Sequence, residues 1–287
     1  MKKVILTPNP YRDKNFKTTL AAERILQEAG METKICLPFQ TEIPQELRAD
    51  LKLSNLQAEM AGADLLICLG GDGTILHSSK LALNYGTPIL GINTGTMGFM
   101  AELESTELEL LSRIARGDYQ VEHRMMLDVE VWREGKRLYS DTALDDAAIT
   151  KGAVARVIQL SVFCDGVEAS TFTGDGVIVC TPTGSTAYSV SAGGPIVEAT
   201  ARNIIITPIC AHTMQAKSLV TAKDRVISVR VGRIGRRNAF LSVDGGRAFR
   251  LNAEDEIRLR RSAHETVLMK LKGTSFYQVV REKLGIS

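Results

Sequence analysis

The chain has 287 residues, of which 44% are hydrophobic and 24% charged, a composition typical of a soluble globular protein with room for two domains. Its formal net charge is +2 and it contains no long Lys/Arg block, so we expect no nucleic-acid partner. The N-terminal apolar run is too short for a signal peptide and no stretch approaches a membrane span, which predicts a cytoplasmic protein with no membrane partner. Five unclustered cysteines, mostly in apolar strand-like runs, predict reduced thiols in the core.

Strands and helices alternate along the first 116 residues. Apolar runs predict strands at 4–7, 33–37, 65–69 and 88–92, and apolar residues at helical spacing predict helices at 15–29, 73–84 and 102–116, with a helix or turn at 45–51. Alternating elements of these lengths predict a parallel, doubly wound sheet.

The third of these strands leads into a glycine-rich loop. Residues 65–69 are apolar without alternation, which predicts a strand buried on both faces, and Gly-Gly-Asp-Gly-Thr follows at 70–74. Helical spacing resumes directly afterwards, and backbone amides at a helix N-terminus bind anions, so the loop is a candidate phosphate site. Asp72 would repel a phosphate unless a cation or a donating hydroxyl lies between them, and a kinase reaction supplies both.

This loop differs from the common nucleotide-binding loops. No lysine follows the glycines, and Leu76 occupies the place of the third glycine of a dinucleotide fingerprint. We expect Asp72 to lie in a solvent-facing loop at the helix N-terminus. An alternative interpretation is that Asp72 only caps the helix.

A second glycine-rich turn, Asn-Thr-Gly-Thr-Met-Gly-Phe at 93–99, follows the fourth strand. In open parallel sheets ligands bind beyond the carboxyl ends of the strands, so the turns at 70–74 and 93–99 are predicted to line one pocket. The alternative is that their glycines only make turns.

The hydrophobic period changes from about residue 119 onward. Alternating or apolar segments predict strands at 127–132, 136–140, 143–150, 155–163, 177–180, 203–209, 225–231, 238–243, 257–259 and 266–271. Many short strands separated by turns predict a β-rich, sandwich-like second domain, after which 275–284 returns to helix and is long enough to pack on the first domain. We therefore predict one domain from 1–120 with 272–287 and another from 121–271.

The β-rich half contains an unusual run of small and hydroxyl residues. Thr-Pro-Thr-Gly-Ser-Thr-Ala-Tyr-Ser-Val-Ser-Ala-Gly-Gly-Pro occupies 181–195, after Gly-Asp-Gly at 174–176. Such a surface would let the polar edges of another molecule approach closely. It contains no Gly-x-Ser-x-Gly elbow and no nearby histidine, so it does not indicate a catalytic serine. The alternative is an ordinary Ser/Thr-rich turn between a strand and a helix.

Taken together, the segments 70–74, 93–99, 143–146 and 175–195 resemble the NAD kinase family in order and spacing, and the resemblance extends from the first strand to 276–285. The pentapeptide alone is shared with lipid kinases and, more distantly, phosphofructokinases, whereas the 181–189 block is far more specific and lipid kinases do not carry it in this form. The resemblance implies a Rossmann-like half plus a β-rich half, usually in homodimers or homotetramers with sites near subunit contacts. It also implies transfer of the γ-phosphoryl group of ATP to the 2′-hydroxyl of the adenosine ribose of NAD, with Mg²⁺ or another divalent metal.

The same resemblance implies roles for individual residues. Asp72 would be the catalytic base, and the phosphate-binding residues would be Gly70, Gly71, Gly73 and Thr74. The NAD-binding residues would be Asp72, Gly73, Phe99, Asp145, Asp146, Asp175, Thr186, Ala187, Tyr188 and Ser191. Phe99 would border the adenine, Asp145 and Asp146 would contact the adenosine portion, and the last five would hold the nicotinamide end. No side chain is assigned to the metal.

The sequence departs from the family pattern at three places. Asp145-Asp146 stands where the family usually has Asn-Glu or Asn-Asp, and Asp-Gly-Gly at 244–246 stands where it usually has Asp-Gly-Gln. Thr173 occupies a position where some members carry an Arg associated with preference for NAD over NADH, which leaves use of NADH open. Two other functions are also weighed: a lipid or other hydroxyl kinase of the same superfamily, and a non-catalytic dinucleotide sensor.

Overall fold

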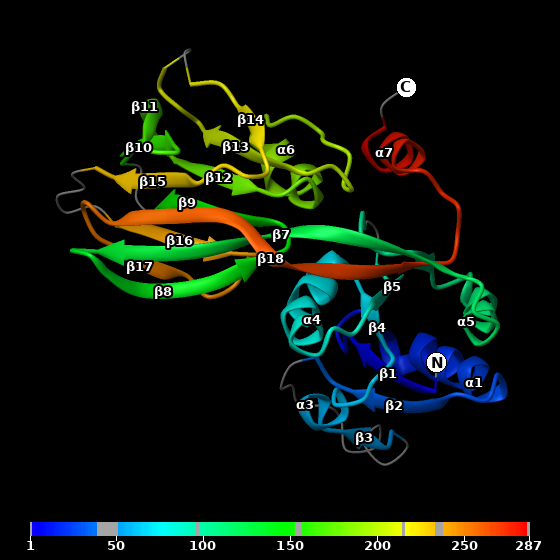
Figure 1. Ribbon diagram of the computed structural model, residues 1–287. Helices are drawn as coiled ribbons and strands as arrows, with labels where there is room; N and C mark the ends of the chain where they lie inside the picture. Colours follow the sequence, from blue (N-terminus) through cyan, green and yellow to red (C-terminus); the bar gives the residue numbers. More distant parts are fainter. Residues whose placement is uncertain are drawn as a thin grey trace. The chain divides into compact units, whose positions relative to one another are not determined.

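The computed structural model describes residues 2–38, 51–95, 98–152, 156–213, 216–232 and 238–285 (Figure 1). The chain divides into two compact units, the first comprising Met1–His123 with Thr266–Ser287 and the second Arg124–Glu265. It passes from one unit to the other within the two long strands β7 (Gln120–Arg133) and β18 (Glu256–Lys270).

The first unit contains a parallel sheet, which confirms the predicted α/β half. Its strands run in the order β5-β4-β1-β2-β3, and every neighbouring pair is parallel. β4 and β5 are buried along their whole length, as expected for strands covered on both faces. A short strand β6 and the C-terminal end of β18 also pair with β5. The bounds are β1 (Lys3–Pro8), β2 (Glu32–Cys36), β3 (Leu53–Ser54), β4 (Leu65–Gly70), β5 (Ile89–Asn93) and β6 (Leu103–Glu104).

Helices connect these strands, and local sequence sets their ends. The longest, α4 (Asp72–Tyr85), ends at Gly86, whose φ of 64° is the left-handed conformation that glycine adopts without strain. The last, α7 (Phe276–Leu284), begins with a capping box between Ser275 and Gln278 and belongs to the first unit, as predicted. The other helical segments are η1 (Lys14–Phe16), α1 (Lys17–Glu28), α3 (Leu56–Glu59), η2 (Leu108–Leu111) and α5 (Ser112–Ala115).

The predicted helix over 102–116 is wrong in its first half. Leu103 is paired with Ile92 of β5, and helical structure begins only at η2. The physical reason is Glu102, a buried acid whose carboxylate accepts the backbone amides of Leu271 at 2.8 Å and Lys272 at 2.5 Å. These contacts with a distant segment hold the chain extended where its apolar spacing favours a helix. Of the segment predicted at 45–51, residues 45–50 lie outside the described residues.

The second unit consists of two antiparallel sheets, which confirms its predicted β-rich character. One has the order β14-β13-β12-β9-β16-β17; the other has the order β11-β10-β15-β18, with β7 pairing both β18 and β8. The bounds are β8 (Lys136–Ala143), β9 (Asp146–Lys151), β10 (Ile158–Cys164), β11 (Val167–Gly174), β12 (Gly176–Cys180), β13 (Asn203–Ile209), β14 (Leu219–Ala222), β15 (Ile227–Val231), β16 (Ala239–Val243) and β17 (Phe249–Leu251), with η3 (Thr183–Thr186) and α6 (Tyr188–Ser191) after β12.

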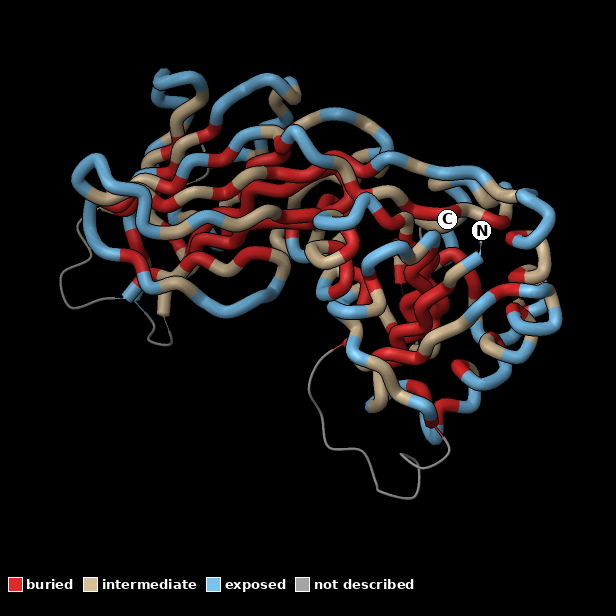
Figure 2. The backbone as a smooth tube through the Cα atoms, turned by 60° about the horizontal axis from the view of Figure 1, so that its bottom comes forward, coloured by how far each residue is buried: buried red, intermediate tan, exposed pale blue. Residues whose placement is uncertain are grey.

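The two sheets share one hydrophobic core, so the unit is a sandwich. Inward side chains of one sheet, such as Leu160 and Val229, pack in the same cluster as Val177 and Leu241 of the other. Figure 2 shows these strands as runs of buried residues. The segments predicted at 257–259 and 266–271 belong to one continuous strand, β18, although the burial of its polar middle does not alternate. Strands β11, β14 and β17 were not predicted, and β11 and β14 are largely exposed.

Two expectations from composition can be compared with the described residues. No helix among them is long and apolar enough to cross a membrane. All five cysteines are free thiols, and Cys36, Cys68 and Cys180 are buried. The prediction of core thiols is wrong for Cys210, which is exposed, and for Cys164, which is only partly buried.

Candidate functional site

In the first unit, the glycine-rich loop joins the buried strand β4 to the N-terminus of α4. β4 ends at Gly70, Gly71 is the N-cap residue in extended conformation, and Asp72 is the first helical residue. A Cβ at Gly70 would overlap the side-chain hydroxyl of Thr74, so only glycine allows Thr74 to fold back over the loop. The first amides of a helix have no intrahelical acceptor and carry partial positive charge. The structure therefore brings Gly70, Gly71, Gly73 and Thr74 together as the sequence predicts.

The Asp72 side chain bonds to the second glycine-rich turn. Its two carboxylate oxygens accept the backbone amides of Phe99 at 2.7 Å and Met100 at 3.1 Å. A Cβ at Gly98 would lie 2.9 Å from Oδ1 of Asp72, so the turn passes close to the carboxylate. The helix-cap interpretation is wrong, because Gly71 occupies the N-cap and no side chain caps α4.

The pKa of the Asp72 carboxyl is raised above its ordinary value because burial disfavours the charged form. The amides of Phe99 and Met100 and the charge of Lys283 oppose this shift without cancelling it. The expected solvent-facing position is therefore also wrong, since Asp72 is partly buried. A carboxylate with a raised pKa is a better proton acceptor than an ordinary surface aspartate.

A third turn, directly after β1, completes this edge of the sheet. The amide of Asn9 donates to the carbonyl of Leu69 at 2.7 Å, and its side-chain Nδ2 donates to Oγ1 of Thr74 at 3.2 Å. The amide of Thr94 donates to the carbonyl of Gly70 at 3.0 Å. The turns after β1, β4 and β5 thus lie side by side, with Asn9 as a member that sequence reasoning missed. Its position directly after a predicted strand was the available signal.

In the second unit, Asp244 anchors the two predicted aspartates. Its carboxylate accepts the backbone amides of Leu144 and Asp145 at 2.8 Å each and that of Asp146 at 3.1 Å. Its own amide donates to the carbonyl of Asp146 at 2.9 Å. Sequence reasoning noted Asp244 only within a departure from the family pattern. The structure gives it a definite part, which is to fix the turn that begins β9.

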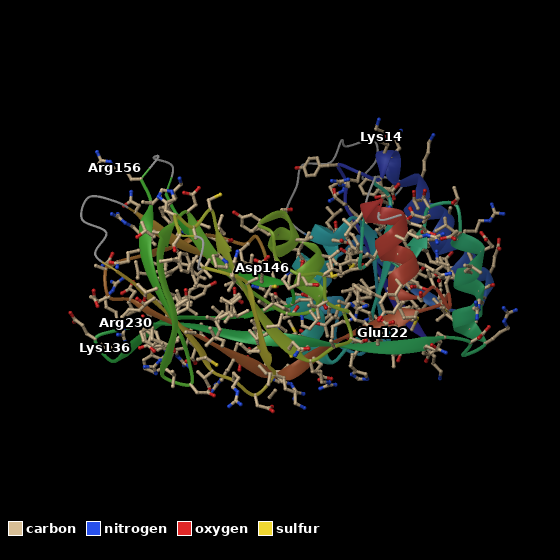
Figure 3. The ribbon with its side chains drawn as sticks, turned by 90° about the horizontal axis from the view of Figure 1, so that it is seen from above. Lys14, Glu122, Lys136, Asp146, Arg156 and Arg230 are labelled. Carbon is tan, nitrogen blue, oxygen red and sulfur yellow. The ribbon has the colours of Figure 1, made fainter. Side chains whose placement is uncertain are left out.

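Asp146 is a buried acid with a strongly shifted titration (Figure 3). Burial, and then the negative charge of Asp244, raise its pKa to about 7. Asp145, beside it, is also buried. At neutral pH the Asp146 carboxyl is therefore protonated in a substantial fraction of molecules and can donate as well as accept a hydrogen bond.

The 181–195 block packs directly against these aspartates. The amide of Thr181 donates to the carbonyl of Asp145 at 2.9 Å and its hydroxyl to the carbonyl of Leu144 at 2.6 Å. A Cβ at Gly184 would overlap the carbonyl oxygen of Asp145, so glycine is required for this close approach.

The prediction of a hydroxyl-lined surface is only partly right. The hydroxyls of Ser185 and Thr186 donate to carbonyls of their own turn, at 2.7 and 3.3 Å, and Ser189 is bonded to Thr207 at 2.8 Å. Burial favours such internal partners over a ligand. The side chains of Tyr188 and Ser191 are the exposed ones among the predicted site residues of this block, while Ala187 is partly buried.

Asp175 does not join this group. It precedes β12, whereas the 181–195 block follows β12, and β12 pairs with β9 so that Cys180, not Gly176, lies opposite Asp146. The Asp175 carboxylate forms an ion pair with Lys151 at 2.6 Å. A five-residue strand, roughly 15 Å long, separates Asp175 from the predicted residues near Asp146.

Among the described residues, no group of three or more His, Cys, Asp or Glu side chains could hold a metal ion.

Comparison with known proteins identifies the family. The model of the ATP-NAD kinase N-terminal domain matches residues 4–119, and that of the ATP-NAD kinase C-terminal domain matches 144–271. The chain is 38% identical to the NAD kinase of Caldanaerobacter subterraneus subsp. tengcongensis over 99% of both chains, and 45% identical to that of Symbiobacterium thermophilum over 77% of this chain and 78% of that one.

Two solved structures have a similar fold. Yeast NADH kinase complexed with NADH has a TM-score of 0.87 at 25% identity, covering 100% of this chain and 88% of that one. An NAD kinase from Archaeoglobus fulgidus in complex with ATP has a TM-score of 0.75 at 24% identity, covering 100% of both chains. With both domain models matched and relatives similar over their full length, the chain belongs to the NAD kinase family.

Proposed function

We propose that the chain transfers the γ-phosphoryl group of ATP to the 2′-hydroxyl of the adenosine ribose of NAD, which yields NADP and ADP. Relatives named NAD kinase, one of them similar over 99% of both chains, support this activity, and the similar solved structures contain NADH and ATP. The observation that carries the proposal is Asp72, a carboxylate with a raised pKa at the N-terminus of α4, beside amides suited to phosphate.

Asp72 acts as the general base in this proposal. As the 2′-oxygen forms its bond to the γ-phosphorus, the bond from that phosphorus to the β-phosphate oxygen breaks, and the hydroxyl proton passes to Asp72. Burial favours this transfer, because it raises the proton affinity of the carboxylate. The amides near Gly71 and Gly73 bind phosphate, while the amide of Thr74 donates to the carbonyl of Gly71 at 2.9 Å and holds the loop in shape. The fixed positions of the three turns orient the reacting groups.

The second unit supplies NAD-binding residues in this proposal. Asp145 and Asp146 contact the adenosine portion, where the partly protonated carboxyl of Asp146 can exchange hydrogen bonds with ribose or adenine groups. Tyr188 and Ser191, whose side chains are exposed, hold the nicotinamide end together with Thr186 and Ala187. Phe99 borders the adenine. The role of Asp175 at the nicotinamide end stays a prediction. Its position at the end of β12 far from Asp146 does not support that role.

We propose that Mg²⁺ arrives bound to ATP. Both oxygens of Asp72 already accept backbone amides, a donor set that favours proton transfer over direct metal ligation. Mg²⁺ prefers phosphate oxygens and water and needs few protein ligands in such sites. When bound, it neutralises charge on the phosphates.

The domain division at 1–120 with 272–287 and 121–271, the cytoplasmic location and a homodimer or homotetramer also remain proposals. The first range holds the phosphate loop, and the second holds the NAD-binding residues. A superfamily kinase acting on a lipid and a non-catalytic sensor stay as alternatives that an assay can separate.

The test is to incubate the protein with Mg-ATP and NAD and to couple the product to an NADP-specific dehydrogenase. We expect NADP to form, and we expect the rate to fall when Asp72 is replaced. The same assay with NADH, read by the appearance of NADPH, measures use of the reduced cofactor. No NADP or NADPH, with labelled phosphate appearing on a lipid, would overturn the proposal in favour of the lipid kinase. Binding of NAD without any transfer would favour the sensor.

A further inference from the structure

The side chain of Arg12 links the turn after β1 to the turn after β5. Its backbone lies in the turn after β1, yet its guanidinium covers Gly95 in the turn after β5. A Cβ at Gly95 would overlap Nη1 of Arg12 and would lie 3.4 Å from its Cζ and 3.6 Å from its Cδ. β4 lies between β1 and β5 in the sheet, so the two outer strands are roughly 10 Å apart. The Arg12 side chain therefore joins the turns after β1 and β5, and both turns are bonded to the 70–74 loop, through Asn9 to Thr74 and through Thr94 to Gly70.

The backbone of Arg12 is held in place through Asn9, which is bonded to the 70–74 loop. Its amide donates to the carbonyl of Asn9 at 3.1 Å, and Asn9 is bonded to both Leu69 and Thr74. On the other side, the buried carboxylate of Asp13 accepts amides at the start of α1, from Thr18 at 3.0 Å and Thr19 at 2.9 Å. The turn thus has fixed bonds at both ends, and the Asp13 charge is already satisfied by α1.

Arg12 differs from Lys283 in whether its charge is already paired. Lys283, which lowers the pKa of Asp72 through its charge, is paired with the carboxylate of Glu104 at 3.3 Å. Arg12 is exposed and forms no ion pair with an acidic side chain in the described parts of the chain. Its guanidinium donors are therefore available at the edge of a loop that also contains the negative charge of Asp72. A phosphate at this loop needs such a cation to offset that carboxylate.

We propose that Arg12 binds a phosphate group of ATP at the 70–74 loop. The inference rests on the proposed function, because it assigns the phosphates at this loop to ATP. A guanidinium presents paired donors that match two phosphate oxygens, and such charge-assisted bonds are stronger than neutral ones. Gly95 permits this placement, because any side chain there would displace the guanidinium.

The first experiment replaces Arg12 with Ala and measures KM for ATP and KM for NAD separately. We expect KM for ATP to rise about 10- to 100-fold, the range of a lost hydrogen-bonded charge contact, with KM for NAD nearly unchanged. Arg12→Lys, which keeps the charge but not the paired donors, should lie between. The matched control is Lys14→Ala, which removes the same charge from an exposed side chain two residues away (Figure 3). We expect no change in either constant for that control.

The second experiment uses Gly95→Ala, which pushes the guanidinium away without removing it. Alone, it should raise KM for ATP; in the Arg12→Ala background, it should add little, because the group it displaces is gone. Full additivity would mean that the two residues act separately, and it would overturn the inference. A rise in KM for NAD instead would assign Arg12 to the NAD pyrophosphate.

Direct binding separates failure of the inference from failure of the proposed function. Titration of the native protein and Arg12→Ala with Mg-ATP in a calorimeter requires no turnover. Weaker ATP binding by Arg12→Ala than by the native protein supports the inference, even if no NADP forms. Equal ATP affinities would overturn it, even in an active NAD kinase. Thermal melting of both proteins verifies that the variant is folded.

Discussion

The carboxylate of Asp72 accepts the backbone amide of Phe99 at 2.7 Å, across 27 residues of sequence. With the amide of Met100 on its other oxygen at 3.1 Å, the same side chain proposed as the base also fixes the turn beside it. A substitution at Asp72 therefore changes both the chemistry and the anchoring of that turn. The two effects need separate measurements.

We predict that Asp72→Asn lowers kcat by about 10²- to 10⁴-fold, the usual range for a positioned general base. The Asn side chain has one acceptor oxygen in place of two, so either Phe99 or Met100 loses its partner. We therefore expect a loss of about 1–2 kcal/mol in the free energy of unfolding, which is more than a helix cap would give. Steady-state kinetics and urea denaturation measure the two effects.

The matched control is Asp64→Asn in the same unit. Asp64 also accepts two backbone amides, from Lys2 at 2.7 Å and Lys3 at 3.0 Å. It precedes the first residue of β4, at the opposite end of that strand from Asp72. We expect a small loss of stability and a normal kcat. Turnover close to normal in Asp72→Asn would leave Asp72 with only its structural part.

The features predicted correctly around the site are those that local sequence determines. The buried strand β4 and the N-terminus of α4 follow from five consecutive apolar residues and the glycines after them. By contrast, the extended backbone at Glu102 depends on the amides of Leu271 and Lys272, more than 160 residues away. Local periodicity contains no information about such a contact.

The difference between local and long-range contacts also explains which residues of the candidate site could be predicted from the sequence. The predicted aspartates Asp145 and Asp146 were found by motif, but Asp244, which anchors both, lies about 100 residues further on. The composition of 181–195 predicted hydroxyls that face a ligand. Composition does not determine which way a side chain points, so this prediction was only partly right. Within the fold, Ser185 and Ser189 have internal partners.

The titration of Asp146 predicts the pH dependence of stability. Its pKa is raised from 3.8 to about 7 in the folded protein, so the folded state retains a proton that the unfolded state releases. Its contribution to stability is fully present below about pH 4 and is lost as pH rises through about 7. We predict that Asp146→Asn is more stable than the native protein at pH 8 and that this difference shrinks by pH 4.5. Urea midpoints at the two pH values measure it.

Asp165 provides a control of opposite sign. The amide of Val226 and the guanidinium of Arg225 lower its pKa, so its contribution is present at neutral pH and is lost as pH falls through the folded-state pKa. Asp165→Asn should therefore be slightly less stable than the native protein at pH 8. A destabilised Asp146→Asn at pH 8 would mean that the ionised carboxylate is better solvated in the fold than its burial indicates.

Tyr188 is predicted to support NAD binding without taking part in the chemistry. Its side chain is 44% exposed in the unliganded protein, so it is available to a ligand. Tyr188→Ala should raise KM for NAD while leaving kcat and KM for ATP almost unchanged, as loss of uniform binding does. Because the ring is half exposed, the free energy of unfolding should change by less than about 1 kcal/mol.

The control is Tyr277→Ala, which removes a 67% exposed ring from α7. We expect that variant to keep both KM values. Equal increases in KM for NAD and KM for ATP in Tyr188→Ala would show that the 181–195 block has been assigned to the wrong ligand.

The last prediction concerns Asp145 and Asp146 as partners for NAD. Burial, and then the charge of Asp244, raise the pKa of Asp146. We predict that Asp145→Asn keeps activity within about tenfold of the native enzyme at neutral pH, or about 1.4 kcal/mol. An amide there can still accept from an adenine amino group or a ribose hydroxyl.

KM for NAD should change with pH around 7 in the native enzyme and in Asp145→Asn, because both retain Asp146, whereas Asp146→Asn should flatten the profile. The measurement is KM for NAD between pH 5.5 and 8.5 for the three proteins, with KM for ATP followed in parallel to identify effects that do not belong to NAD. If Asp145→Asn flattens the profile and Asp146→Asn does not, Asp145 is the titrating contact and the assignment to Asp146 is wrong. Superimposable profiles for all three would mean that the ionisation of neither carboxyl affects NAD binding. The bonds of this segment to Thr181 and Asp244 would then serve only to hold the turn.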